Sequence, residues 1–207
     1  MVSAGLSPVA PSRCCRKGLR HLSVSGLIHS AWLLYFSQPA VDRAIYQAIR
    51  GKTIHSVVEL GIGGGVRLQR LAEMLGANAA NLPLRYTGID LFEARPASAP
   101  GLSLKQAFQE LRPPQVQVKL VPGDPYSALL RTANSLAGTD LVIISADQDQ
   151  DALERAWQYL PRMLHPKSLV FREEGEAGQS KTRFRALSAA DVGRLATAAK
   201  SSSRRAA

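Results

Sequence analysis

A short apolar segment that ends in glycines is the part of the chain best suited to hold a ligand. It runs from Val57 to Gly65 with the sequence VVELGIGGG, and a helical pattern follows it. Gly61, Gly63 and Gly65 lack a Cβ atom, so the backbone can turn tightly there and come close to a bound molecule. An apolar strand, a glycine turn and a helix in this order are typical of a nucleoside-binding loop.

Glu59 restricts the kind of nucleoside that this loop accepts. A carboxylate two residues before Gly61 would repel the pyrophosphate of a dinucleotide, which needs uncrowded N–H groups at a helix N-terminus. The dinucleotide pattern also places Gly or Ala three residues after its second glycine, where this chain has Val66. S-Adenosylmethionine carries an ammonium and a sulfonium group and no phosphate, so an acidic residue is compatible with it. A glycine-rich turn without a ligand stays open as the alternative.

Two further carboxylates follow predicted strands. The segment LRYTGIDLFE, residues 84–93, predicts a second strand that ends at Asp90, where a carboxylate beside the glycine loop can accept both ribose hydroxyls. Asp124 follows a predicted strand over residues 116–121. Its place before Pro125 also makes it a good helix N-cap, and both roles are compatible. For Asp90, the start of a simple turn is the alternative.

Strand and helix patterns alternate along most of the chain, which predicts parallel strands joined by right-handed crossovers. Predicted helices cover residues 39–50, 66–75, 103–111, 151–164 and 188–200. Predicted strands cover residues 55–60, 84–93, 116–121, 139–145, 168–174 and 181–187. We expect the sheet order 3-2-1-4-5, with room for one extra edge strand.

Over residues 40–174 this order of features resembles the class I S-adenosylmethionine-dependent methyltransferase superfamily, whose first motif reads acidic-x-Gly-x-Gly-x-Gly. The resemblance implies an α/β, Rossmann-like, doubly wound and mostly parallel sheet, truncated relative to the family's seven strands, with S-adenosyl-L-methionine as cofactor. It also implies site residues. The methionine part would lie against Glu59, Gly61, Gly63 and Gly65. The ribose would lie against Asp90 and Leu91, and the adenine amine against Asp124. Ser145, at the end of the fourth strand, is also a predicted cofactor-binding residue.

The catalytic end departs from the family pattern. Metal-dependent members carry an aspartate after the fourth strand and an Asp-Asn pair after the fifth, where this chain has Ser145 and Arg172–Glu174. Three nearby aspartates are interpreted as helix caps, so we predict no metal; they are Asp147, Asp149 and Asp151. Tyr126 and His165 are weak candidates for a general base, with a structural role as the alternative for His165. We assign no catalytic residue.

Length, charge and composition limit the number of domains and the kinds of partner. The chain has 207 residues, enough for one α/β domain, and a formal net charge of +10. Residues 1–41 carry +4 and residues 177–207 carry +6, whereas residues 42–176 are formally neutral. Basic tails favour weak contact with polyanions over a dedicated nucleic-acid site. No apolar run is long enough to span a membrane.

We expect three segments: a flexible basic arm over residues 1–38, a methyltransferase-like domain over residues 39–200 and a disordered tail over residues 201–207. Adjacent Cys14 and Cys15 favour a reducing compartment or a dispensable arm, and we expect a cytoplasmic protein. The expected function is methyl transfer to an unidentified small-molecule acceptor. A cofactor-binding or regulatory protein without chemistry is the first alternative, and an NAD(P)-dependent oxidoreductase, disfavoured by Glu59 and Val66, is the second.

Overall fold

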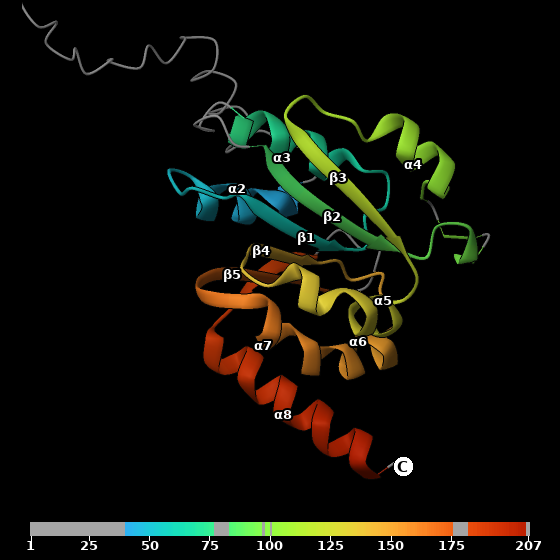
Figure 1. The fold of residues 1–207 in the computed structure, drawn as a ribbon, viewed down its shortest axis with the longest axis vertical. Helices are drawn as coiled ribbons and strands as arrows, with labels where there is room; N and C mark the ends of the chain where they lie inside the picture. Colours follow the sequence, from blue (N-terminus) through green and yellow to red (C-terminus); the bar gives the residue numbers. More distant parts are fainter. Residues whose placement is uncertain (1–39, 77–82, 97, 100, 176–181, 206–207) are drawn as a thin grey trace, which may run out of the picture.

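The structure of the protein is a computed structural model that describes residues 40–76, 83–96, 98–99, 101–175 and 182–205 (Figure 1). Within these residues, six strands form one sheet in the order β3-β2-β1-β4-β5-β6. The strands are β1 (Ser56–Leu60), β2 (Leu84–Asp90), β3 (Val116–Pro122), β4 (Thr139–Ile144), β5 (Leu164–Glu174) and β6 (Arg183–Leu187). Strands β1 to β5 are parallel, and β6 pairs antiparallel with β5. The predicted Rossmann-like order and its extra edge strand are confirmed.

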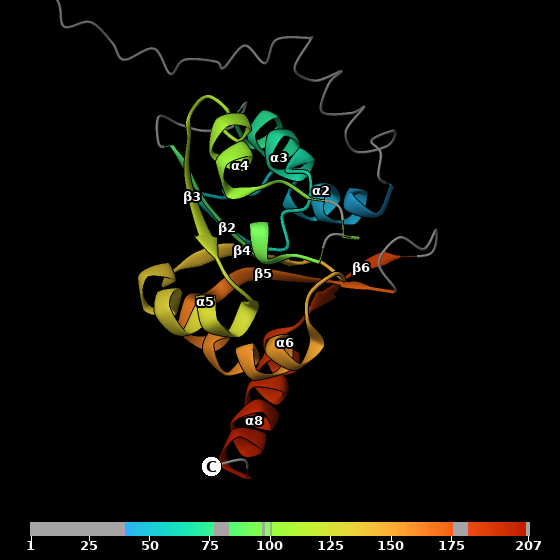
Figure 2. The same ribbon diagram turned by 90° about the vertical axis from the view of Figure 1, so that its right-hand side faces the viewer.

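Helices cover both faces of the sheet (Figures 1 and 2). One layer contains α2 (Arg43–Ile49), α3 (Val66–Gly76) and α4 (Leu104–Glu110). The other contains α5 (Pro125–Thr132), α6 (Gln150–Ala156), α7 (Leu160–Met163) and α8 (Ala189–Arg205). Each layer forms its own apolar core with the sheet, and the two cores use alternate residues of the central strands, such as Val57 and Val58. The central strands are therefore apolar on both faces, as parallel sheets require.

The strand order reverses at β1, which lies between β2 and β4. From β1 the chain proceeds outward to β2 and β3, then returns to β4 on the other side. Helices that follow the two inner strands therefore lie on opposite faces, and ligands of sheets of this kind bind outside the carboxyl ends of the strands at this point. The glycine loop after Leu60 lies at this point.

Two predicted elements differ from the structure near the end of the sheet. The single helix expected over residues 151–164 is divided into α6, the 3-10 turn η4 (Trp157–Tyr159) and α7. Pro161 lies in the first turn of α7, where it has no N–H to continue the preceding helix. Strand β5 begins at Leu164, earlier than expected, and so contains His165.

Helix α8 extends past the predicted C-terminal boundary. It continues to Arg205, so the helix includes most of the segment expected to form a disordered tail. Ser201 and Ser202 donate hydroxyl hydrogen bonds to the carbonyl oxygens of Ala198 and Ala199, at 2.7 and 2.9 Å, which the helical conformation makes possible. The predicted arm over residues 1–38 lies outside the described residues. No helix in the described part of the chain combines the length and apolar character needed to cross a membrane.

A hydrogen-bonded cluster at Asp140 fixes the amino ends of β1, β4 and β5. Asp140 Oδ2 accepts from the backbone N–H groups of His55 and Ser56 and from Ser56 Oγ, at 2.9, 3.0 and 2.9 Å. His165 Nε2 lies 2.9 Å from Asp140 Oδ1. Burial alone would raise the pKa of Asp140, but these hydrogen bonds outweigh it and hold the pKa below its usual value.

Replacing Asp140 by asparagine should reduce the free energy of unfolding by about 1–3 kcal/mol at neutral pH, because an amide leaves donors of His55 and Ser56 without a charged acceptor. A lowered pKa contributes stability that is lost as the pH falls through the folded-state value. The difference between wild type and Asp140→Asn should therefore shrink in acid. Urea unfolding at about pH 7 and about pH 3 measures both values; a difference that grows in acid would contradict the expectation.

Candidate functional site

The glycine loop follows β1 and has two kinds of glycine. Gly61, Gly63 and Gly65 all have positive φ angles of 85°, 53° and 72°. A Cβ atom on Gly61 would overlap the side chains of Gln148 and Asp147, and one on Gly65 would overlap Leu111. In contrast, no atom of the described residues lies within 4 Å of the Cβ positions at Gly63 and Gly64. The loop is thus packed at its two ends and open in the middle.

This contrast predicts opposite tolerance at neighbouring positions. Gly65→Ala should destabilise the fold by about 1–3 kcal/mol, because alanine must adopt a positive φ and displace Leu111. Gly64→Ala is the matched control, because its φ is not positive and its Cβ points into open space. Thermal unfolding of both variants measures the difference. Equal melting temperatures would show that Gly65 is not held as described.

Asp90, at the end of β2, supports this loop directly. Its Oδ2 atom accepts hydrogen bonds from the backbone N–H groups of Ile62 and Gly63, at 2.8 and 3.3 Å. Its Oδ1 atom accepts from Phe92 N at 3.4 Å and forms an ion pair with Arg95. The Asp90 side chain is only 2% exposed and that of Arg95 only 8%. The carboxylate therefore lies beside the glycines, as predicted, with Arg95 over its outer oxygen.

The chain after β2 returns to the glycine loop before it enters α4. Leu102 N donates to the carbonyl oxygen of Gly63 at 3.3 Å, and Leu104 N donates to Glu93 Oε1 at 2.8 Å. Leu91, the residue predicted beside the ribose, is half-buried at the start of this segment. These contacts hold Arg95 near the open side of the loop.

Glu59 points into the layer of α2 and α3. It is 1% exposed; its Oε2 atom accepts from Tyr86 Oη at 2.6 Å, and its Oε1 atom pairs with Arg67. Burial raises the pKa of Glu59, although Arg67 and the Tyr86 hydroxyl act against this shift. The carboxylate thus has two protein partners, and its effect on the loop passes through Arg67, in the first turn of α3.

Arg67 joins several elements through one guanidinium group. It pairs with Asp42 Oδ1 at 2.9 Å and with Glu59, and it donates to Ser145 Oγ at 3.2 Å. Its guanidinium carbon lies 5.0 Å from the ring centre of Phe184 on β6. Arg67 thereby connects α3 with β1, β6, the 3-10 turn η1 (Ala40–Asp42) before α2 and the residue that follows β4. Its single charge balances one of two buried carboxylates.

Ser145 and Asp124 reach the same end of the sheet from other strands. Ser145 Oγ donates to the carbonyl oxygen of Gly61 at 2.9 Å, and Ser145 N donates to Leu60 O at 2.9 Å. Gly123 N donates to the carbonyl oxygen of Asp90 at 2.9 Å, which places Asp124 beside the end of β2. Asp124 Oδ1 accepts from Ser127 N at 3.0 Å, so the predicted N-cap of α5 is present.

The candidates for a general base have structural contacts. His165 lies at the amino end of β5, in the Asp140 cluster, away from the glycine loop. The Tyr126 ring lies under the guanidinium of Arg155, at 4.5 Å, and beside Tyr159. Asp149 caps α6 by accepting from Ala152 N at 2.6 Å, and Asp151 lies in the first turn of α6, whereas Asp147 accepts from the side chain of Gln148 and does not cap the helix. Within the described residues, no group of three His, Cys, Asp or Glu side chains is placed to hold a metal.

Arg67 and Arg95 are the site residues that the sequence analysis missed. Both lie within eight positions of a predicted site carboxylate, at Glu59 and Asp90. A signal was present, because a charge in a strongly apolar strand requires a partner. The sequence alone does not distinguish these arginines from the many exposed ones.

Comparisons with known proteins give matches only among solved structures. No family model matches the chain, and no curated protein matches it. The calicheamicin methyltransferase CalS11 is 17% identical, with a TM-score of 0.48, over 81% of this chain and 84% of that one. A putative caffeoyl-CoA O-methyltransferase from Staphylococcus aureus is 17% identical, with a TM-score of 0.45, over 73% and 67%. MycE methyltransferase from the mycinamycin biosynthetic pathway, in complex with Mg and SAH, is 15% identical, with a TM-score of 0.45, over 71% of this chain. The match covers 38% of the MycE chain.

Proposed function

We propose that the protein is an S-adenosylmethionine-dependent methyltransferase that acts on a small-molecule acceptor. The observation that carries the proposal is the Asp90 carboxylate, which lies against the amides of Ile62 and Gly63 at the carboxyl end of β2. In a doubly wound sheet, an acidic residue at this point accepts hydrogen bonds from ribose hydroxyls. The sequence pattern of an acidic residue before alternating glycines also supports a methionine cofactor, although the Glu59 carboxylate itself is buried and paired with Arg67 and Tyr86.

The fit of the cofactor to these residues depends on Arg95. The open space at Gly63 and Gly64 allows a ligand to approach the loop backbone. Asp90 Oδ1 is paired with Arg95, so ribose hydroxyls reach this oxygen only when Arg95 moves aside. Asp124 uses Oδ1 to cap α5, and a carboxylate has a second oxygen that can accept from the adenine amine.

The residues of this chain would bind and orient the reactants. When bound, S-adenosylmethionine supplies a methyl group on a positively charged sulfur. Asp90 would fix the ribose and Asp124 the adenine edge, while Gly63 and Gly64 leave room beside the methionine part. Methyl transfer relies largely on holding the acceptor in line with the reacting group, so a site of this kind requires no dedicated acid or base.

A cofactor-binding protein without chemistry is the second candidate. The polar groups directly after β4 and at the end of β5 already have protein partners: Ser145 donates to Gly61 O, and Glu173 Oε2 accepts from Ala146 N at 3.1 Å. These are the positions at which related metal-dependent enzymes carry their ligands. This observation favours binding without transfer.

Isothermal titration of the full chain with S-adenosylmethionine, S-adenosylhomocysteine and NAD separates the candidates. Binding of the two methionine compounds and not of NAD is the expected result, and binding of NAD alone would refute the proposal. A second measurement follows S-adenosylhomocysteine release with hydroxyl, amine and thiol acceptors of low molecular weight. Release with an acceptor supports the enzyme, whereas tight cofactor binding without release with any acceptor favours the second candidate.

A further inference from the structure

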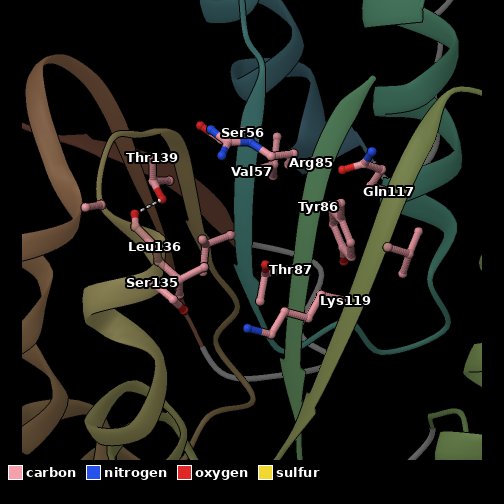
Figure 3. Close-up of a pocket in the computed structure, with 13 residues that line it drawn as sticks. Ser56, Val57, Arg85, Tyr86, Thr87, Gln117, Lys119, Ser135, Leu136 and Thr139 are labelled. Carbon is pink, nitrogen blue, oxygen red and sulfur yellow. Dashed lines mark hydrogen bonds between the residues drawn. The ribbon is translucent and has the colours of Figure 1, made fainter. Parts of the chain in front are cut away.

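A second concave site lies on the α5 face of the sheet, at the amino ends of the strands (Figure 3). We name it the basal trough and define it by Ser56, Arg85, Thr87, Gln117, Lys119 and Ser135. Its volume is about 240 Å³. Most lining residues belong to the first residues and the centres of β1, β2 and β3, and Ser135 belongs to the segment before β4, whereas the glycine loop follows the other end of β1. The two sites are therefore at opposite edges of the sheet.

The trough exists because the helical layer is short at this place. Helix α5 has eight residues and continues into the 3-10 turn η3 (Ala133–Leu136), whose end forms one wall. Ile89 and Val121, near the carboxyl ends of β2 and β3, are buried in the core of this layer. Among the described residues, the preceding positions on the same face lack a covering helix: Arg85, Gln117 and Lys119 are exposed, whereas Thr87, between them on β2, is 7% exposed.

The uncovered residues are polar where a parallel sheet normally has apolar side chains. Arg85 lies opposite Gln117 and Thr87 lies opposite Lys119 in the register of β2 and β3. Alternation places all four on the same face as Ile89 and Val121. Figure 3 shows the Lys119 side chain extending across β2 toward Thr87. This face therefore presents four neighbouring side chains that can form hydrogen bonds, two on β2 and two on β3.

The charge of this lining is positive and unbalanced. Arg85 and Lys119 are cationic, and none of the residues that line the trough is acidic. Neither cation forms an ion pair with any residue that the structure describes. The Asp140 carboxylate behind Ser56 is already engaged by His55, Ser56 and His165.

Thr87 adds a hydroxyl group to the two cations of the trough. Its side chain lines the trough from the centre of β2, and the residue is only 7% exposed. Its hydroxyl has no hydrogen-bond partner among the described residues, unlike Ser56, whose hydroxyl bonds to Asp140 and Gly138. The Thr87 oxygen is not among the buried side-chain atoms of the described residues that lack a partner, so it is open to the trough and can donate to a molecule bound there.

We propose that the basal trough binds a small organic anion with a phosphate or carboxylate group. Arg85 offers a planar set of N–H donors, Lys119 a point charge and Thr87 a hydroxyl, which together match such a group. The volume is below the roughly 300–1,000 Å³ of sites for larger ligands, so a compact anion fits better than a whole nucleotide. The proposal is independent of methyl transfer.

The test is a titration of the full chain with inorganic phosphate and, separately, with succinate, at constant ionic strength, followed by backbone amide NMR shifts. Saturable shifts at Arg85–Thr87 and Gln117–Lys119 are expected with at least one anion, and the stronger one identifies the head group. Arg85→Gln and Lys119→Gln should each weaken binding by about tenfold, because a charge-assisted hydrogen bond is lost. Thr87→Val, which keeps the shape, should weaken it less.

Lys105→Gln is the matched control, because Lys105 is an exposed cation on α4, in the opposite layer. It should leave anion binding unchanged, and all four variants should retain the wild-type melting temperature within a few degrees. No saturable shift with either anion, or equal weakening by Lys105→Gln, overturns the proposal. Binding of S-adenosylhomocysteine, measured on the same variants, reports on the glycine-loop site separately and should not change.

Discussion

Replacing Arg67 by methionine should lower the free energy of unfolding by about 3–5 kcal/mol at neutral pH, since it leaves buried charges without their partner. Methionine keeps most of the aliphatic length of the side chain, so the packing against Phe184 changes little. Glu59 and Asp42, at 1% and 2% exposure, would lose the cation that lies between them. Urea unfolding measures the loss.

The stability loss of Arg67→Met should depend on pH in a direction that follows from the pKa of Glu59. Burial raises the pKa of Glu59, and Arg67 opposes the rise, so the variant should have a still higher folded-state pKa. A raised carboxyl pKa means that the folded state binds more protons, and stability is lost as the pH rises through that value. The deficit of Arg67→Met should therefore be largest near pH 7 and smaller at about pH 4.

Two further variants separate a charge effect from general damage. Adding Glu59→Gln to Arg67→Met removes one of the stranded carboxylates and should recover part of the lost stability at neutral pH. Arg50→Met is the matched control, because Arg50 is exposed at the end of α2, and it should cost less than about 1 kcal/mol. An Arg67→Met variant as stable as Arg50→Met would show that the buried network does not hold the site.

Replacing Asp90 by alanine should weaken S-adenosylhomocysteine binding by about 100-fold. Two charge-assisted hydrogen bonds to the ribose, at about 1.5 kcal/mol each, amount to about 3 kcal/mol, and each 1.4 kcal/mol is about tenfold. The same change should destabilise the protein by about 1–3 kcal/mol, because the buried Ile62 N–H loses its acceptor. Calorimetric titration and thermal unfolding report the two effects separately.

Arg95→Gln distinguishes a ribose contact from mere support of the loop. It removes the ion pair on Asp90 Oδ1 but leaves the hydrogen bonds of Oδ2 to Ile62 and Gly63. If ribose hydroxyls and Arg95 compete for this oxygen, Arg95→Gln should bind the cofactor as tightly as wild type or more tightly. Unchanged affinity in Asp90→Ala would refute the ribose assignment, and a large loss in Arg95→Gln would show that the arginine itself contacts the ligand.

Local patterns in the sequence were sufficient to predict the fold. Apolar runs such as TDLVII, the glycines after Leu60 and the regular alternation of strand and helix predicted the strand order and the position of the loop. The cap role of Asp124 followed in the same way from its place before Pro125. These features depend on neighbours a few residues apart, so one-dimensional information contains them.

Element boundaries were less well determined by local preference. The helix expected over residues 151–164 contains Pro161, yet its apolar spacing continues across the break. The helix divides before Pro161, and Trp157 in the intervening turn and Leu160 at the start of α7 are both buried in the core. The end of α8 was misplaced because a serine-rich sequence has a weak helical preference, whereas burial of Ala199 anchors the helix shortly before it.

The sequence by itself determined that a Rossmann-like sheet carries a glycine loop with acidic residues at the ends of its first two strands. Only the tertiary structure decided what these residues contact: Arg67 covers Glu59, Arg95 covers Asp90, and Arg85 and Lys119 face an uncovered part of the sheet. The physical reason is that backbone pattern follows from neighbours along the chain, whereas the partner of a charge depends on strand register and on which helix packs above it.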